Sequence, residues 1–300
     1  MSFIETFFLA AAAALYVASF VLAIKCQERY AYFSLVAGLV FQLLSAAIRW
    51  VGIGHPPVFG TYEATLSASW FLLLFVALSF RSVHRNFRLL VLVSVPLALL
   101  LLWYGLTLFR TERIPLTISE MSLWVDFHAL FAWLAFAPFT LAFCLSAHYL
   151  WSTRNGSFSP SVLYPGTTES PRAAEFKGKK AESENPNLQP YIVDELAFRY
   201  VNFGFVMHTV MFALGSYYSS IIFGIWWWWD PVFSLSLIAW LSVGLYIHMR
   251  LFFNWHGRKA AWLFVAVFSA IILSYWGLVY LPPGSTFHVF DVFDTVPKMF

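Results

Sequence analysis

The sequence predicts an all-α membrane protein that crosses the bilayer about eight times. Of the 300 residues, 60% are hydrophobic and only 11% are charged, whereas charged residues make up about a quarter of an ordinary soluble domain. The apolar residues fall into eight runs, each close to the roughly twenty residues that span a bilayer as a helix. No soluble domain fits between the runs, so we expect a single integral membrane domain over residues 1–300.

The expected spans follow one another with mostly short connections. They cover residues 3–25, 32–53, 66–83, 88–108, 127–151, 198–222, 233–250 and 261–281. The first has no basic segment before it and carries Glu5 at its start, so we expect it to span rather than to be cleaved as a signal peptide. Residues 152–191 are rich in Ser, Pro, Gly, Lys and Glu, which predicts a flexible cytoplasmic loop.

The distribution of Lys and Arg predicts the orientation. With the N-terminus outside, only Arg49, Arg110, Arg113 and Lys298 of the 18 Lys and Arg residues fall on the outer side. Because an excess of these residues marks cytoplasmic connections, both termini are expected on the outer (periplasmic) side. The outer face then carries the stretch from Gly54 to Glu63, residues 110–126, the segment 223–236 and the tail.

The segment 223–236 contains four consecutive tryptophans followed by an acid and a proline. A belt of aromatic residues at a membrane boundary accounts for one or two indoles, but not easily for four in a row. A flat apolar platform with several N–H donors suits a large planar ligand such as a porphyrin. Asp230 with Pro231 is also a common way to begin a helix, and both roles can hold together. The candidate platform residues are Trp226, Trp227, Trp228, Trp229 and Asp230.

Histidines provide candidate iron ligands, because a neutral imidazole is a common axial ligand of haem. His55, His128 and His288 fall at or above the outer boundary, and their place beside the tryptophans favours His128 with His288 as a pair. His208 falls near mid-membrane, while His148 and His248 fall just before the cytoplasmic boundary. An imidazole inside a bilayer needs a partner, which a hydrogen bond across helices also supplies. Zinc suits these positions less well, since no cysteine or carboxylate cluster accompanies them.

At these residues the sequence resembles the CcsA/ResC-type subunit of the system II cytochrome c synthase, within the haem-handling membrane proteins that carry a tryptophan-rich "WWD" segment. An upstream motif is similar at Gly54-His55-Pro56-Pro57, Tyr62-Glu63 and Trp70. The sequence departs from the family pattern at Phe223 and over Val232–Leu235, where the family has Lys-Glu-Thr-Trp. The matching positions of the main motif are Gly224, Trp227, Trp229, Asp230, Pro231, Leu237, Ile238, Trp240, Tyr246, His248 and Arg250.

The resemblance implies a haem lyase activity on the outer face, in which haem b is joined to the Cys-x-x-Cys-His of an apocytochrome c. It implies that His128 and His288 are external axial ligands. It further implies that His248 is an intramembrane ligand, usually paired with a histidine from a CcsB/ResB-like partner. A second haem held within this chain, between His248 and His148 or His208, is a further hypothesis. The membrane would be the bacterial cytoplasmic membrane or, alternatively, the thylakoid.

Three other functions remain open from the sequence. One is a haem-transport or delivery protein of the same superfamily that makes no covalent bond. Another is a b-type haem subunit that passes electrons in a respiratory complex, which the departures after Pro231 favour somewhat. A membrane protein with a plain aromatic belt is the third. The chain has no Cys-x-x-Cys-His of its own, so it is not itself a c-type cytochrome, and nothing in it indicates nucleic-acid binding.

Overall fold

The computed structural model describes residues 2–58, 60–80, 87–108, 122–154 and 189–277. Within these ranges, eight helices are long and apolar enough to cross a membrane, which confirms the predicted fold class. His288 and most of the expected loop 152–191 lie outside the described residues. The helices are α1 (Phe3–Ile24), α2 (Glu28–Ile53), α3 (Gly60–Leu78), α4 (Phe87–Leu108), α5 (Leu123–Ser152), α8 (Gln189–Phe223), α9 (Pro231–Phe252) and α10 (Arg258–Trp276).

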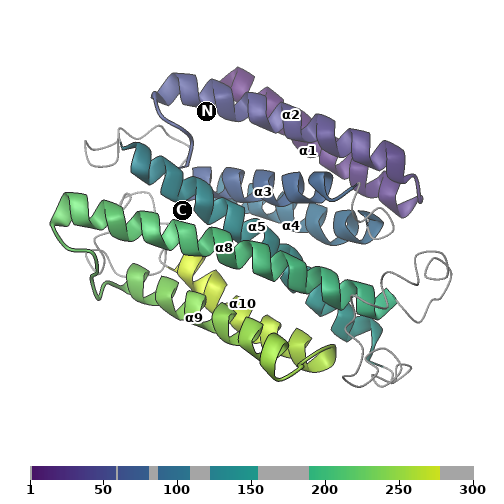
Figure 1. Cartoon of the computed structure of the whole chain (residues 1–300). Helices are drawn as coiled ribbons and strands as arrows, with labels where there is room; N and C mark the ends of the chain where they lie inside the picture. Colours follow the sequence, from purple (N-terminus) through teal and green to yellow (C-terminus); the bar gives the residue numbers. More distant parts are fainter. Residues whose placement is uncertain (1, 59, 81–86, 109–121, 155–188, 278–300) are drawn as a thin grey trace.

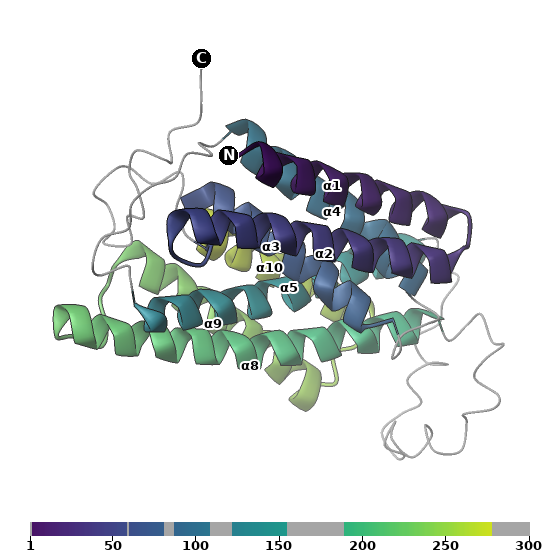
Figure 2. The same ribbon diagram turned by 90° about the horizontal axis from the view of Figure 1, so that it is seen from above.

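The helices lie side by side along a common direction (Figures 1 and 2). Helix α5 is central, because it packs against α3, α4, α8 and α10. On one side, the α1–α2 hairpin packs against α4 and α3, and on the other, α9 packs against α8 and α10. The helices α5, α8, α9 and α10 thus form a group of four that carries His128 and the tryptophans.

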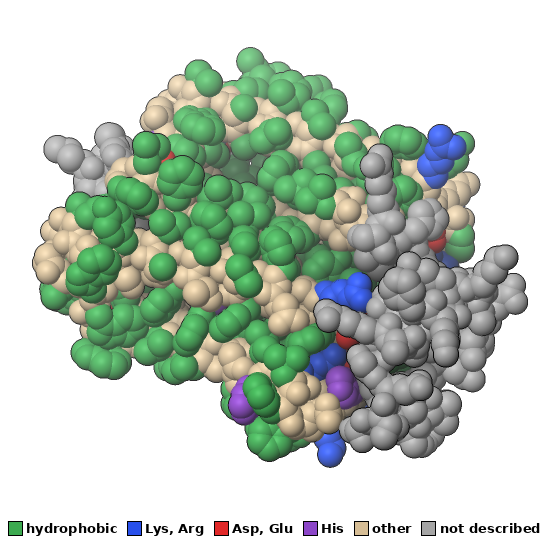
Figure 3. Space-filling view, viewed as in Figure 1, with side chains coloured by type: hydrophobic (Ala, Val, Ile, Leu, Met, Phe, Trp, Pro, Cys, Tyr) green, Lys and Arg blue, Asp and Glu red, His purple; other side chains and the backbone are tan. Residues whose placement is uncertain are grey.

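The two ends of the bundle differ in chemistry. One end, the tryptophan end, holds segments 54–58 and 224–230 and the start of α5; it is on the left in Figure 1. The other, the basic end, holds the turns 25–27, 153–154 and 253–257 and the starts of α2, α4 and α8. Of the nine Lys and Arg residues in the described ranges, eight lie at the basic end and Arg49 alone at the tryptophan end. Figure 3 shows the blue side chains gathered on this side.

Helices α3 and α8 begin furthest ahead of their predicted starts, because polar residues are buried near the beginning of each. Helix α3 starts at Gly60 and ends at Leu78, rather than covering 66–83. Its first turn includes Glu63, which is only 5% exposed and pairs with Arg49. Helix α8 starts at Gln189 rather than 198, and Asp194 near its start pairs with Arg250. Hydropathy alone misses such turns, since their charges are neutralised by residues distant in the sequence.

Helices α5 and α8 approach closely at two glycines. A Cβ atom added to Gly204 would come within 2.7 Å of the Phe139 ring, and one added to Gly215 within 2.9 Å of the His128 ring. In both helices, about three turns separate the two contacts, in opposite chain directions. The antiparallel register of this pair is therefore fixed by an aromatic ring and an imidazole that each fit against a glycine.

Candidate functional site

The tryptophan segment, residues 224–230, is a short connection between α8 and α9. Helix α8 ends before Gly224, whose φ of +71° lies in the region that favours glycine. The Ser219 hydroxyl donates to the Ile225 carbonyl at 2.8 Å. At the other end, Asp230 Oδ1 accepts from the Val232 N–H at 2.8 Å, and Pro231 is the first residue of α9. The chain geometry is thus held at both ends, with Asp230 as the helix cap.

The four indoles do not lie in equivalent surroundings. Trp227 packs between Phe212 of α8 and Phe233 of α9, with ring centroids 5.6 and 5.3 Å away. The rings of Trp227 and Trp229 meet edge to face, with centroids 5.5 Å apart. Trp229 is nevertheless 81% exposed, and Trp226 is 61% exposed. Trp228 is half-buried beside Phe223. The exposed apolar surface is therefore formed mainly by Trp226 and Trp229, while Trp227 anchors the segment to both helices.

The indole nitrogen of Trp227 is an unused donor. It is buried and has no hydrogen-bond acceptor among the residues that the structure describes. A buried indole N–H ordinarily finds a partner, so this position suits an acceptor brought by a ligand.

His128 lies in the second turn of α5, half-buried against α8. Its Nδ1 is 2.9 Å from the Met211 carbonyl oxygen. Since a carbonyl only accepts, Nδ1 carries the proton as donor and Nε2 keeps its lone pair. A backbone carbonyl that orients a histidine through the second ring nitrogen is a frequent companion of metal ligation. The side chain is thus held in the tautomer that an iron ligand requires.

Aromatic contacts link the turn that holds His128 to the tryptophan segment. Trp124, one turn before His128, meets Tyr217 of α8 edge-on at 4.8 Å. Tyr217 in turn lies 6.0 Å from the ring of Trp226. His128 and the exposed indoles therefore belong to one surface at the tryptophan end.

His55 also lies at the tryptophan end. Its Nδ1 is 2.9 Å from the carbonyl oxygen of Pro56, and its imidazole is close enough to Asp126 of α5 to act on that carboxyl electrostatically. The structure therefore brings His55 near the start of α5, on the same end of the bundle as His128.

His208 is buried beneath this surface. It is fully enclosed, with Phe139 and Tyr275 as ring neighbours at 5.9 and 6.4 Å. Neither ring nitrogen has a hydrogen-bond partner among the described residues. Nearby, the Tyr275 hydroxyl donates to the Ala132 carbonyl at 2.9 Å. His208 therefore lies in a packed interior, close enough to His128 for the two imidazoles to interact electrostatically.

Two further candidate ligands, His248 and His148, lie near the basic end on different helices. His248 is exposed on α9 beside Phe252 and Phe253, with ring centroids 4.6 and 5.7 Å away. His148 is half-buried on α5. Helix α9 packs against α8 and α10 and makes little direct contact with α5. His248 is exposed, whereas His208 on α8 is fully enclosed.

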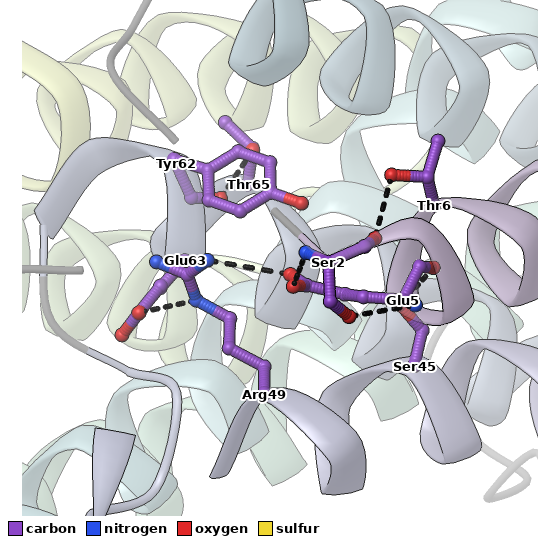
Figure 4. A network of polar contacts seen from close by, with 8 residues as sticks. All are labelled: Ser2, Glu5, Thr6, Ser45, Arg49, Tyr62, Glu63 and Thr65. Carbon is purple, nitrogen blue, oxygen red and sulfur yellow. Dashed lines mark hydrogen bonds and ion pairs between the residues drawn. The ribbon is translucent and has the colours of Figure 1, made fainter. Parts of the chain in front are cut away.

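Two buried ionic clusters were not predicted as sites. At the tryptophan end, Arg49 Nε lies 2.6 Å from Glu63 Oε1 and its Nη1 lies 3.3 Å from Glu5 Oε1, joining α1, α2 and α3 (Figure 4). Its guanidinium also lies over the Tyr62 ring at 4.9 Å. A lone Arg in a predicted span, with one acid at the start of another span and one just before a third, was the signal that could have found this cluster.

At the basic end, Arg250 Nη1 lies 2.7 Å from Asp194 Oδ2, which also accepts from the Gly257 N–H at 3.3 Å. The cluster ties the start of α8 to the turn between α9 and α10. Burial and the adjacent Arg250 guanidinium lower the pKa of His256 in that turn. Arg250 thus points into the bundle, although His248 two residues earlier points out.

These features define an integral membrane protein of eight described helices with an aromatic and imidazole surface at one end. The chain belongs to the cytochrome C assembly protein family, whose model matches residues 58–285. Cytochrome c assembly implies haem handling, which agrees with the chemistry of the tryptophan end.

Curated relatives named cytochrome c biogenesis protein CcsA match most of the chain. The Prochlorococcus marinus (strain MIT 9515) protein is 24% identical over 265 residues, covering 87% of this chain and 83% of the relative. The Synechococcus sp. (strain RCC307) protein is 27% identical over 252 residues, covering 81% and 79%. The Porphyra purpurea protein is 26% identical over 275 residues, covering 83% and 85%.

Proposed function

We propose that this chain is the membrane subunit of a cytochrome c synthase. It binds haem b as substrate at the tryptophan end and presents it for thioether attachment to the Cys-x-x-Cys-His of an apocytochrome c. The observation that carries the proposal is the His128 tautomer, fixed by Met211 beside exposed indoles. In this tautomer, Nε2 of His128 carries the lone pair that an axial ligand of haem iron needs. His288 is the proposed second external ligand, by resemblance.

The remaining residues of the surface have complementary roles. Trp226 and Trp229 offer apolar rings to the porphyrin face, while the buried N–H of Trp227 suits a polar group such as a propionate. In each attachment, a thiol adds across a vinyl double bond: a carbon–sulfur bond forms and the hydrogen goes to the neighbouring carbon. The protein's part is to orient vinyl group and thiol, which can contribute up to several kcal/mol by making the step effectively unimolecular.

The distribution of charge supports the tryptophan end as the external, catalytic face. Eight of the nine described Lys and Arg residues lie at the basic end, which is therefore the proposed cytoplasmic side. The one exception, Arg49, is buried in ion pairs and adds no free charge to the external face. Attachment on that face would meet apocytochromes after their export.

The exposure of His248 supports a partner protein. An imidazole that faces lipid is costly, and such residues ordinarily face another protein. His248 lies on the outer surface of α9, flanked by the exposed rings of Phe252 and Phe253. A CcsB/ResB-like partner that covers this surface could supply the opposing ligand of an intramembrane haem. The exposed position of His248, on a helix that makes little contact with α5, favours this arrangement over a haem held wholly within the chain.

The test is maturation of a reporter apocytochrome in a host without its own maturation system, with a CcsB/ResB-type partner co-expressed. We expect covalent haem on the reporter, its loss with His128→Ala, and partial recovery with added imidazole. His256→Ala, at the basic end, is the matched histidine control. Bound haem in the chain without any covalent product would support delivery or electron transfer instead. A purified chain without a Soret band would overturn the haem-based proposal as a whole.

A further inference from the structure

Helices α2 and α3 part to leave an apolar groove of about 420 Å³. Its walls include Tyr32, Val36 and Leu43 of α2 and Trp70, Leu74 and Leu78 of α3. Leu43 and Leu78 are 51% and 67% exposed, so the groove is open along its side to the surrounding membrane.

The groove is held open by contacts at both of its ends. Toward the tryptophan end, the Gln42 side chain donates to the Leu66 carbonyl at 3.0 Å and to the Ser69 hydroxyl at 2.9 Å. Toward the basic end, the Tyr32 ring stacks on Phe80 at 4.2 Å. These contacts set the spacing of α2 and α3 on either side of the groove.

The walls present hydrocarbon along most of their length. The indole N–H of Trp70 on α3 donates to the Leu39 carbonyl on α2 at 3.0 Å, so this donor is satisfied by a contact between the two walls. The Tyr32 hydroxyl, at the basic end, is the remaining polar group of the walls. A guest of this groove is therefore a hydrocarbon chain with its polar part at the basic end.

The length of the groove matches one leaflet. From Tyr32 to Leu43 the rise along α2 is about 16 Å at 1.5 Å per residue, close to half of the roughly 30 Å hydrocarbon core. The groove thus accommodates a chain that enters from the leaflet at the basic end.

Positive charge lies where the groove reaches the water boundary. Arg29 is exposed one turn before Tyr32 on α2, with its guanidinium over the Phe33 ring at 5.9 Å. Lys25, at the end of α1, and Arg88, in the first turn of α4, are exposed at the same end. Cations at this depth attract the phosphate of anionic lipids.

We propose that the groove between α2 and α3 binds one acyl chain of an anionic phospholipid whose phosphate is held by Arg29. This site goes beyond the proposed haem chemistry. It would fasten the α1–α2 hairpin to the rest of the bundle, because the chain fills the space between that hairpin and α3.

The test compares phosphatidylglycerol with phosphatidylcholine of the same acyl chains, both supplied in equal amounts in nanodiscs. The purified protein is released from the nanodiscs in the mass spectrometer, and the lipid molecules that stay bound to it are counted by native mass spectrometry. We expect one phosphatidylglycerol retained per chain, preferred several-fold over phosphatidylcholine. Arg29→Gln should abolish the preference while the groove still retains one lipid. Arg199→Gln, 63% exposed on the side chain at the same end on α8, should leave it unchanged.

Filling the groove tests the acyl-chain position. The double substitution Val36→Phe with Leu74→Phe should abolish retention of both lipids, and Val40→Phe alone should reduce it. Leu100→Phe adds the same bulk on an exposed position of α4 outside the groove, and should retain lipid as the unmodified chain does.

Thermal unfolding identifies any variant that fails to fold. Undiminished phosphatidylglycerol in the folded, filled variants would overturn the proposal, as would equal retention of the two lipids or a phosphate-free molecule in the groove. None of these measurements depends on haem.

Discussion

The imidazole of His128 rests on the backbone of Gly215, and the contact leaves no room for a methyl group between α5 and α8. A Cβ at Gly215 would lie 2.9 Å from Cε1 and 3.0 Å from Nδ1 of the ring. The same ring donates to the Met211 carbonyl one turn earlier on α8. The plane and the tautomer of the proposed iron ligand are therefore set by a contact between two helices, which is more rigid than a loop.

Gly215→Ala should displace the His128 ring without removing it. The added methyl group forces the imidazole away from α8 and breaks its bond to Met211, at a cost of about 1–3 kcal/mol for overpacking. We expect weaker haem retention and a changed axial-ligand signature in the optical and electron paramagnetic resonance spectra. The matched control is Gly244→Ala, where the nearest atoms lie at 3.9 Å. Equal haem retention in the two alanine variants would mean that His128 is not a ligand, or not one that α8 orients.

The contact between His128 and Gly215 illustrates what the sequence could and could not predict. Hydropathy predicted the helices, and residue order predicted that His128 lies at the entry to α5, because both depend on local composition. The packing of an imidazole against a glycine depends on which helices meet and in which register. Neither segment of the sequence alone predicts that. The early starts of α3 and α8 were missed for the same reason, since Glu63 and Asp194 are neutralised by Arg49 and Arg250.

The motif alone also did not distinguish the roles of the indoles. The resemblance singles out Trp227 and Trp229 together, whereas the structure anchors Trp227 between Phe212 and Phe233 and exposes Trp229 with Trp226. The tertiary position of Phe212, fifteen residues earlier on α8, decides which ring is covered. By contrast, the cap at Asp230 was predictable, because capping is a local property of Asp followed by Pro.

Substitutions at Asp230 should separate its capping role from its charge. Asp230→Ala removes the bond to the Val232 N–H and should lower the free energy of unfolding by about 1 kcal/mol. Asn caps about as well, so Asp230→Asn should stay within a few tenths of a kcal/mol of the unmodified chain. We expect the Asn variant to retain haem, as judged by the Soret band of the purified protein. A folded Asn variant without haem would show that the carboxylate charge itself is required at the site.

Breaking the Asp194–Arg250 pair should destabilise the bundle strongly. Both side chains are buried, at 5% and 2% exposed. Asp194→Leu removes the carboxylate at 2.7 Å from the buried guanidinium, which keeps Glu195 Oε2 at 3.9 Å from its Nη2, and should cost about 3 kcal/mol. Replacing both residues, as Asp194→Leu with Arg250→Met, should recover much of this loss, because no unpaired charge remains. Unfolding titrations in mixed micelles measure the free energy of unfolding of the unmodified protein, the two single variants and the double variant. A double variant as unstable as the two single losses added together would contradict this account of the pair.

His248→Ala is the control for the Asp194–Arg250 measurements, because His248 lies on the same helix as Arg250 but is exposed. It should leave the free energy of unfolding within about 0.5 kcal/mol of the unmodified chain, while Arg250→Met should lower it. The two residues are both positions of the family pattern, yet they point to opposite sides of the helix. A shared motif thus combines a structural residue with one that is available to a partner, and stability measurements distinguish them.

His208→Leu should stabilise the protein. The imidazole is fully buried and neither nitrogen has a partner among the described residues, so the fold carries the desolvation cost of an unsatisfied group, about 1–3 kcal/mol. Leucine is of similar size and fills the space between Phe139 and Tyr275 without that cost. Unfolding in mixed micelles should therefore require more denaturant, with haem content and spectrum unchanged. If the variant instead loses haem or shifts its Soret band, His208 takes part in holding haem, as the sequence allowed.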